Sequence, residues 1–242
     1  MRARPPLRRG PAGPDGKIRR VETMLARLVP TYRAAADPER AEGNRAYLRD
    51  QFPFLGIPTP KRRALSREVL AGLPAPTIDE LEPIARACWE LPEREYQYFA
   101  VDLLVRYARR LDPSALTTVH HLVTAKSWWD TVDALASNVV GPIVAAHPEA
   151  VATMEAWLVD ENLWLARTAI LHQLMYKERT DTARLFRYCL ARAEHTDFFI
   201  RKAIGWALRQ YAWTDPAAVR EFVSAHAAEL SPLSRREATK NL

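Results

Sequence analysis

At 242 residues, with 48% hydrophobic and 26% charged residues, the chain is long enough for one large globular domain with a substantial core. None of its apolar runs approaches the roughly 20 residues that a membrane-spanning helix requires. Residues 1–20 also lack the apolar middle region of a secretory signal. These features exclude an integral membrane protein and predict a cytoplasmic protein with no membrane partner.

The chain is basic, with a formal net charge of +6 and an isoelectric point near 9.5. Such a charge suits a polyanionic partner, because phosphates neutralised by Lys or Arg release condensed counterions. Charge alone is a weak indicator, since 7 of the basic residues lie within residues 1–20. Cys88 and Cys189 are far apart and belong to no metal-binding motif, so we expect two small buried side chains, no disulfide, no metal and no cofactor.

Residues 1–20 are rich in Pro, Gly and Arg and predict a disordered basic tail. Residues 21–242 are dominated by Ala, Leu, Arg and Glu, contain no convincing alternating strand, and predict one all-α domain. A capping residue followed by Pro marks several helix starts. The expected starts lie at Asp37, Thr59, Asp112 and Asp215, and near Thr77, Pro92, Pro148, Thr180 and Ser231.

The spacing of these starts indicates a repeat. Asp112, His147, Asp181 and Asp215 follow one another at intervals of 35, 34 and 34 residues, and two helices fit into each interval. Helical hairpins repeated at this period are typical of an α-solenoid. We therefore expect HEAT-like hairpin repeats forming a curved single domain whose concave face holds an extended partner.

The segment KSWWDTVD, residues 126–133, predicts a helix with Ser127 as its N-cap. Trp129 and Asp133 are four residues apart and share one helix face, whereas Trp128 falls on the apolar face. Two interpretations remain open. The commoner one is a pair of core tryptophans with a solvated Asp133, and the other is a site that combines an aromatic ring with a carboxylate.

Arg167 lies 34 residues after Asp133, in the otherwise apolar helix start LWLARTAIL. One repeat separates the two residues, so they are expected at equivalent positions of neighbouring hairpins. A buried Arg requires a partner, and a carboxylate one repeat away provides it. A purely structural salt bridge is as good an interpretation as a functional one.

The segment DFFIRKAIGWALR, residues 197–209, places Arg201 and Lys202 near a helix N-terminus, where backbone N–H groups also favour phosphate. Gly205 permits close approach of another backbone or a ligand beside Trp206. Core packing is the commoner meaning of such a tryptophan.

The segment FPFLGIPTPKRR, residues 52–63, delivers a helix whose start carries three successive cations, Lys61, Arg62 and Arg63. Cations at a helix N-terminus destabilise the helix, a cost that makes sense if a phosphate lies opposite. A solvated basic cap is the alternative.

Taken together and in this order, these segments resemble the AlkD-type DNA alkylation repair family of HEAT-like repeat glycosylases. The resemblance covers essentially all of residues 21–242, and its matching strings are FPFLGIPTPKRRAL, KSWWDTVDALASNVVG, LWLARTAILHQL, DFFIRKAIGWALRQYAWTDPAAV and LSPLSRREA. It implies a concave cleft that grips duplex DNA. It also implies that Trp129, Asp133, Arg167 and Trp206 face the lesion as the catalytic set.

The resemblance further implies DNA-binding residues. Tyr47 matches an aromatic position that lines the cleft. The candidates for phosphate contacts are Lys61, Arg62, Arg63, Lys126, Arg201, Lys202, Arg235 and Arg236. Such contacts position a duplex without reading its sequence.

The function that follows is a monofunctional DNA repair glycosylase, which hydrolyses the N-glycosidic bond of alkylated purines such as 7-methylguanine and 3-methyladenine in double-stranded DNA. No lysine stands at a position that the family uses for catalysis, so lyase chemistry is not expected. We expect a monomer without cofactor that is nucleoid-associated if bacterial. The alternatives are a non-catalytic DNA-binding member of the fold and a helical-repeat scaffold that binds another protein.

Overall fold

The structure, a computed structural model, describes residues 13–242, apart from the side chain of Pro14. The disordered tail predicted for residues 1–20 lies outside the described residues as far as residue 12. From Pro14 onward the chain is helical, so the first helix begins before residue 21. Pro14 occupies the first turn, where its missing N–H costs nothing and its fixed φ suits a helix.

All regular secondary structure in residues 13–242 is helical, which confirms the all-α helical-repeat prediction. The chain groups into two compact units that meet in sequence between Arg110 and Leu111, and the single domain stays a prediction. The concave cleft stays a prediction. No helix within the described part of the chain is both long and apolar enough to cross a membrane.

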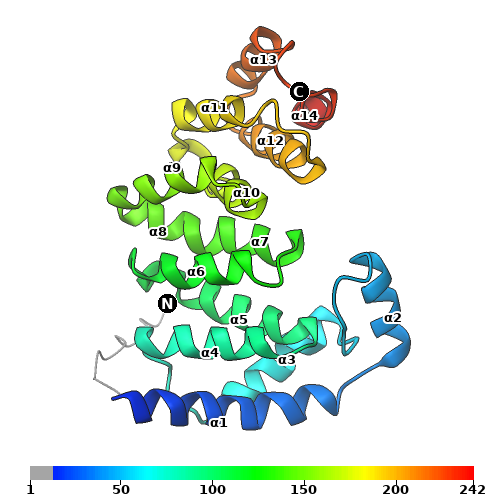
Figure 1. Ribbon diagram of the computed structural model, residues 1–242, viewed down its shortest axis with the longest axis vertical. Coiled ribbons are helices and arrows are strands. Elements are labelled where there is room, and N and C mark those ends of the chain that lie inside the picture. The colour runs from blue at the N-terminus through cyan, green and yellow to red at the C-terminus, as the bar shows by residue number, and fades with distance from the viewer. Residues whose placement is uncertain (1–12) are drawn as a thin grey trace. The chain divides into compact units, whose positions relative to one another are not determined.

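Unit 1 contains α1 (Pro14–Arg33), α2 (Pro38–Tyr47), α3 (Thr59–Leu70), α4 (Ile78–Glu90), α5 (Arg94–Tyr107) and a 3-10 turn (Ala108–Arg110). Helices α1 and α4 lie side by side (Figure 1). Their contact is apolar because Met24, Leu28 and Tyr32 recur at four-residue intervals on one face of α1. The Tyr32 ring stacks on that of Tyr96 with centroids 5.7 Å apart.

Unit 2 contains α6 (Ala115–Thr124), α7 (Trp129–Leu135), a π-helical turn (Ala136–Val140), α8 (Gly141–Ala146), α9 (Val151–Val159), α10 (Leu163–Leu171), α11 (Thr182–Ala191), α12 (Phe198–Tyr211), α13 (Pro216–Ala225) and α14 (Pro232–Ala238). Successive helices pair as hairpins, of which α9 with α10 is the clearest (Figure 1). Helix α10 is central, because it packs against α7, α9 and α12.

Several predicted helix starts are confirmed by their caps. The side chains of Asp37, Asp181, Asp215 and Ser231 each accept a hydrogen bond from a backbone N–H three residues later. Thr77 is the N-cap residue of α4, and its backbone N–H donates to the Glu80 carboxylate at 2.8 Å.

Two predicted starts were displaced. Helix α6 begins at Ala115, because Asp112 instead accepts hydrogen bonds from the backbone and hydroxyl of Ser114 in a turn. Helix α7 has Trp128 rather than Ser127 as its N-cap residue. The Ser127 hydroxyl is committed elsewhere, since it donates to the carbonyl of Val123 at 2.6 Å.

Both cysteines are free and buried, as predicted. Burial raises the pKa of the Cys88 thiol to about 12, and it also raises the pKa of the Cys189 thiol. A thiol with so high a pKa is not a nucleophile at neutral pH. Both side chains therefore act as small apolar core residues.

Candidate active site

The centre of the candidate site is an ion pair between Asp133 of α7 and Arg167 of α10. Arg167 Nε donates to Asp133 Oδ1 at 2.6 Å, and Arg167 Nη2 donates to Asp133 Oδ2 at 2.8 Å. The Asp133 side chain is 13% exposed, and the Arg167 side chain is 5% exposed. The one-repeat separation of 34 residues therefore brings the two side chains together, as predicted.

Burial governs the acidity of this carboxyl group. Burial raises the pKa of Asp133, although the hydrogen bonds and the positive charge of Arg167 act in the opposite direction. The negative charge of Asp130 also raises this pKa, to a smaller extent. Both Asp133 oxygens accept N–H bonds from a permanently charged guanidinium, which is the geometry of the ionised form.

Helix α7 is short and merges into a π-helical turn directly after Leu135. The hydroxyl of Ser137 in this turn donates to the carbonyl of Asp133 at 2.8 Å. Single π-helical turns are rare in proteins as a whole, but those that occur are often found at functional sites. The turn alters the register of the helix within one turn of the candidate carboxylate.

Arg167 is also bound from a third helix. Its Nη1 donates to the backbone carbonyl of Phe199, in the first turn of α12. The guanidinium thus joins α7, α10 and α12, and Arg167 as a whole is buried. Because these contacts use Nε and one N–H from each Nη, they fix the plane of the guanidinium and thereby the orientation of Asp133.

An aromatic cluster that the sequence analysis did not predict lies beside this guanidinium. The rings of Trp128, Trp164 and Phe199 have centroids 4.9–5.8 Å apart, and the Arg167 guanidinium lies 6.0 Å from the centre of the Phe199 ring. The indole Nε1 of Trp128 is buried without a hydrogen-bond partner. One signal was available, because Trp164 precedes Arg167 by three residues and so shares its side of α10.

The two predicted catalytic tryptophans are both half-buried. Trp129 is the first residue of α7, one helical turn before Asp133 and on the same face. Trp206 lies on α12, seven residues after Phe199, and so on the side of α12 that meets Arg167. Helix geometry therefore places Trp129 on the Asp133 face of α7 and Trp206 on the Phe199 face of α12.

Unit 1 carries four of the predicted DNA-binding residues. Tyr47, the last residue of α2, is 73% exposed. Lys61 and Arg63 are exposed on the first turn of α3. Arg62 is different, because it is buried and its Nη1 donates to Asp102 at 2.8 Å. Arg62 is thus not available to a phosphate, and its inclusion in the set of phosphate contacts is corrected.

The loop before α3 is held by a residue that the sequence analysis missed. The buried carboxylate of Glu95 accepts hydrogen bonds from the backbone N–H groups of Leu55, Gly56 and Ile57 at 2.7–3.2 Å. Gly56 has a φ of +84°, and a Cβ there would lie 2.1 Å from the carbonyl oxygen of Asp37. Glu95 therefore fixes the loop that delivers Lys61 and Arg63 at the start of α3.

The remaining predicted cations lie in unit 2. Lys126 is half-buried with a φ of +50°. Arg201 is half-buried and donates from Nε to the carbonyl of His195 at 2.9 Å. Lys202 pairs with Glu237 at 3.0 Å. On α14, Arg235 is half-buried and Arg236 is exposed.

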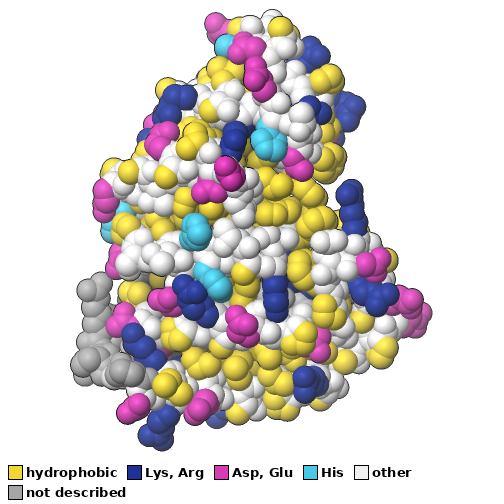
Figure 2. Space-filling model, in the orientation of Figure 1, with side chains coloured by type: hydrophobic (Ala, Val, Ile, Leu, Met, Phe, Trp, Pro, Cys, Tyr) yellow, Lys and Arg dark blue, Asp and Glu magenta, His cyan; other side chains and the backbone are white. Residues whose placement is uncertain are grey.

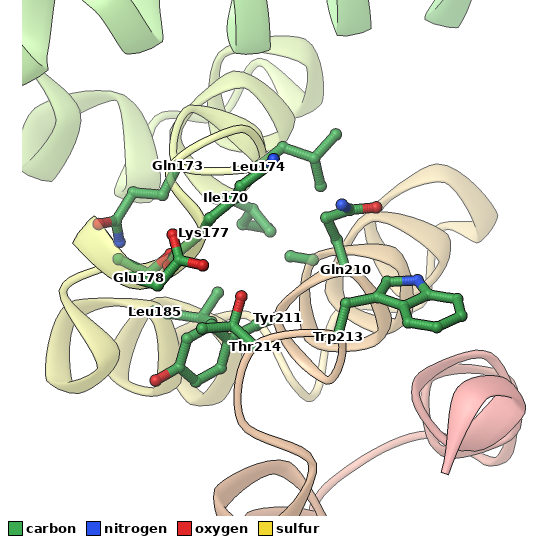
Figure 3. A pocket seen from close by; sticks show the side chains of 12 residues that line it. Ile170, Gln173, Leu174, Lys177, Glu178, Leu185, Gln210, Tyr211, Trp213 and Thr214 are labelled. Atoms are coloured by element: carbon green, nitrogen blue, oxygen red, sulfur yellow. The ribbon is translucent and has the colours of Figure 1, made fainter.

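Charge alone marks no site on the face that Figure 2 shows. On the face drawn in Figure 2, Lys and Arg side chains are interspersed with Asp and Glu in each unit. A pocket of about 230 Å³ in unit 2 is lined by residues of α10, α11 and α12 and of the segments that follow α10 and α12, among them Lys177, Gln210 and Trp213 (Figure 3). Its lining differs from the candidate site. Within residues 13–242, no group of three or more His, Cys, Asp or Glu side chains is arranged to hold a metal ion.

Fold and site together define a helical-repeat protein with a buried, bidentate Asp–Arg pair between α7 and α10. Trp129 lies on α7 and Trp206 on the adjacent α12. Residues 30–242 match the model of the DNA alkylation repair enzyme family, and the chain belongs to this family.

A predicted DNA alkylation repair enzyme from Enterococcus faecalis is 37% identical to this chain, with a TM-score of 0.79 over 86% of this chain and 96% of that one. The protein smu.31 from Streptococcus mutans UA159 is 17% identical, with a TM-score of 0.57 over 72% of this chain and 90% of that one, and is similar in fold alone. No curated protein sequence matches this chain.

Proposed function

We propose that this DNA alkylation repair enzyme is a monofunctional glycosylase that releases cationic alkylated purines, such as 7-methylguanine and 3-methyladenine, from double-stranded DNA. The observation that supports this most strongly is the buried bidentate pair of Asp133 and Arg167. A structural salt bridge requires no tryptophan on the carboxylate's own helix face, whereas Trp129 lies there.

The chemistry assigns a role to each residue. Alkylation at a ring nitrogen makes the purine cationic and a good leaving group, so little acid catalysis is required. As the glycosidic bond breaks, the deoxyribose develops oxocarbenium character. The Asp133 carboxylate stabilises this positive charge and positions the attacking water.

Arg167 acts through Asp133. Its contacts with Asp133 and the Phe199 carbonyl hold the carboxylate in one orientation, so that no reorganisation is needed as charge develops. Trp129 and Trp206 present π-faces to the cationic base and sugar, an interaction of about 0.5–2 kcal/mol for each ring.

DNA binding is assigned to exposed or half-buried side chains. The proposed set is Tyr47, Lys61, Arg63, Lys126, Arg201, Lys202, Arg235 and Arg236. These residues contact sugar and phosphate and carry no sequence preference.

The test is the release of 7-methylguanine from a duplex that carries one such lesion, with excess protein and abasic sites quantified. We expect release by the wild type and a loss of at least about 100-fold in Asp133→Asn, the scale for removing a preorganised electrostatic group. The matched control is Glu155→Gln, which alters another bidentate carboxylate–Arg pair, with Arg187, at 2.7 Å on the surface of the same unit.

Glu155→Gln is expected to retain wild-type release. Borohydride should trap no covalent complex, because no amine attacks the sugar in a monofunctional enzyme. Salt-dependent binding without release by the wild type would contradict the proposal and favour the non-catalytic DNA-binding alternative.

A further inference from the structure

The motif LSPLSRREA near the C-terminus contributes a buried carboxylate to which the proposed mechanism assigns no role. Glu237 on α14 is 3% exposed and binds three cations. Its Oε1 lies 3.0 Å from Lys202 Nζ and 2.6 Å from Lys240 Nζ, and its Oε2 lies 2.6 Å from Arg209 Nη1. One buried negative charge therefore meets three positive charges.

Two of these cations flank Trp206. Lys202 lies four residues before Trp206 and Arg209 three residues after it, so all three side chains share one face of α12. Glu237 binds both flanking side chains, one through each carboxylate oxygen. Along α12, Trp206 therefore lies between two residues whose side chains bind the same carboxylate of α14.

The backbones of α12 and α14 are in close contact at the same place. A Cβ at Gly205, the neighbour of Trp206, would lie 2.4 Å from Glu237 Cβ and 2.8 Å from the carbonyl oxygen of Ser234. The hydroxyl of Ser234 donates to the carbonyl of Arg201 at 2.9 Å. Glu237 is therefore held rigidly against the turn of α12 that carries Trp206.

The charge of Glu237 has a second consequence. A cationic base that stacks on Trp206 would be repelled by Lys202 and Arg209, and a carboxylate between them offsets this repulsion. Burial raises the pKa of Glu237, but the hydrogen bonds from Lys240 and Lys202 outweigh it and lower the pKa to about 2. The negative charge is thus present at any working pH.

We propose that Glu237 is a positioning residue for Trp206, which confines the indole between Lys202 and Arg209 and offsets their charge so that a cationic base can approach it. This role rests on the proposed glycosylase function. It also assigns the pair of α12 and α14 a function beyond contact with phosphate.

The first test is Glu237→Gln, which preserves the shape of the side chain and removes its charge. We expect the maximal rate of 7-methylguanine release to fall at least about tenfold, the scale of one lost interaction of about 1.4 kcal/mol. Affinity for an undamaged duplex should rise about threefold at the same time, because the three cations lose their internal counter-charge. Glu237→Asp retains the charge and is expected to restore most of the rate, and Glu155→Gln, which alters a surface ion pair in the same unit, should change neither quantity.

The second test does not depend on activity. The protein contains 7 tryptophans, so 5-fluorotryptophan labelling gives a resolvable ¹⁹F NMR spectrum, in which the loss of one signal in Trp206→Phe assigns that residue. We expect Glu237→Gln to shift and broaden this signal selectively. Arg209→Met, which removes one flanking side chain with little risk to folding, should do the same.

An unchanged Trp206 signal in both variants, or unchanged affinity for undamaged DNA in Glu237→Gln, would overturn the proposal. A wild-type protein that releases no base would contradict the glycosylase function and leave these two measurements to decide the role of Glu237 separately.

Discussion

Within residues 13–242, Arg62 in unit 1 and Arg167 in unit 2 are both buried and paired with an aspartate, and the two pairs differ in the environment of the carboxylate. In unit 1 Arg62 is as buried as Arg167, yet its partner Asp102 is 35% exposed and receives a single short hydrogen bond. In unit 2 Asp133 is 13% exposed and receives two. The burial of the arginine therefore does not distinguish the pairs, whereas the environment of the carboxylate does.

The residues around the two arginines differ as well. Arg62 lies 5.2 Å from the centre of the Tyr98 ring and belongs to the packing of unit 1. Arg167 also binds the carbonyl of Phe199 and lies on the same side of unit 2 as Trp129. A carboxylate fixed by two bonds in a site of low dielectric constant is suited to stabilise a developing positive charge. An aspartate left to solvent is suited to anchor an arginine.

The largest expected difference between the pairs is in catalysis. Arg167→Met should lower 7-methylguanine release by about 100-fold or more, because Asp133 loses the groups that orient it. Arg62→Met should change the rate less than about threefold, since its contacts are structural. Single-turnover rates with excess protein measure both. A comparable loss of release rate in the two variants would show that the two arginines do not differ in their contribution to catalysis.

The next largest difference is in stability. A double-mutant cycle on Asp133 and Arg167 should give a coupling free energy of about 3 kcal/mol, because each single variant leaves an unpaired buried charge. The cycle on Asp102 and Arg62 should give about 1 kcal/mol, since Asp102 regains water when its partner is removed. Urea unfolding monitored by circular dichroism measures both cycles, and equal couplings would contradict the comparison.

The dependence of activity on pH gives a smaller effect. Catalysis requires ionised Asp133, so the rate should fall as the pH drops through its pKa, which burial raises above the usual value near 4. Asp130→Asn removes a negative charge that raises this pKa, so the acid limb of the pH–rate profile should move to lower pH. A limb that moves to higher pH, or that persists unchanged in Asp133→Asn, would assign it to another group.

The smallest effect concerns the three consecutive cations at the start of α3. Lys61→Ala and Arg63→Ala should each reduce the slope of log affinity against log salt by about one unit, because each removes an exposed phosphate contact. Arg62→Met should leave the slope unchanged, since its guanidinium is occupied by Asp102. Fluorescence anisotropy with a labelled duplex between 50 and 300 mM salt measures these slopes, and a reduced slope in Arg62→Met would show that Arg62 binds phosphate.

The sequence predicted the parts of this picture that depend on periodicity. Pairing of Asp133 with Arg167 followed from their one-repeat separation, because equivalent positions of adjacent hairpins meet. The caps at Asp37, Asp181 and Asp215 followed from local chemistry. Both signals lie within one helix or between neighbouring hairpins.

The sequence did not predict which side chains of a helix point into the core. It also did not predict contacts between helices at positions that are not equivalent in the repeat. Arg62 was grouped with Lys61 and Arg63, although successive helical residues point about 100° apart and one of the three had to turn inward. Nothing local indicated that Glu95 holds the loop before α3 or that the Phe199 carbonyl binds Arg167. These contacts arise only when separate helices pack.

The most direct test of the central claim measures transition-state charge without measuring turnover. Duplexes that carry a cationic pyrrolidine or a neutral tetrahydrofuran in place of one deoxyribose differ chiefly in the charge that Asp133 is proposed to stabilise. We predict that the wild type binds the cationic duplex at least about tenfold more tightly, an energy of about 1.4 kcal/mol, and that Asp133→Asn loses this preference. A wild type without the preference, or an Asp133→Asn variant that retains it, would show that the carboxylate held by Arg167 is not the reaction centre.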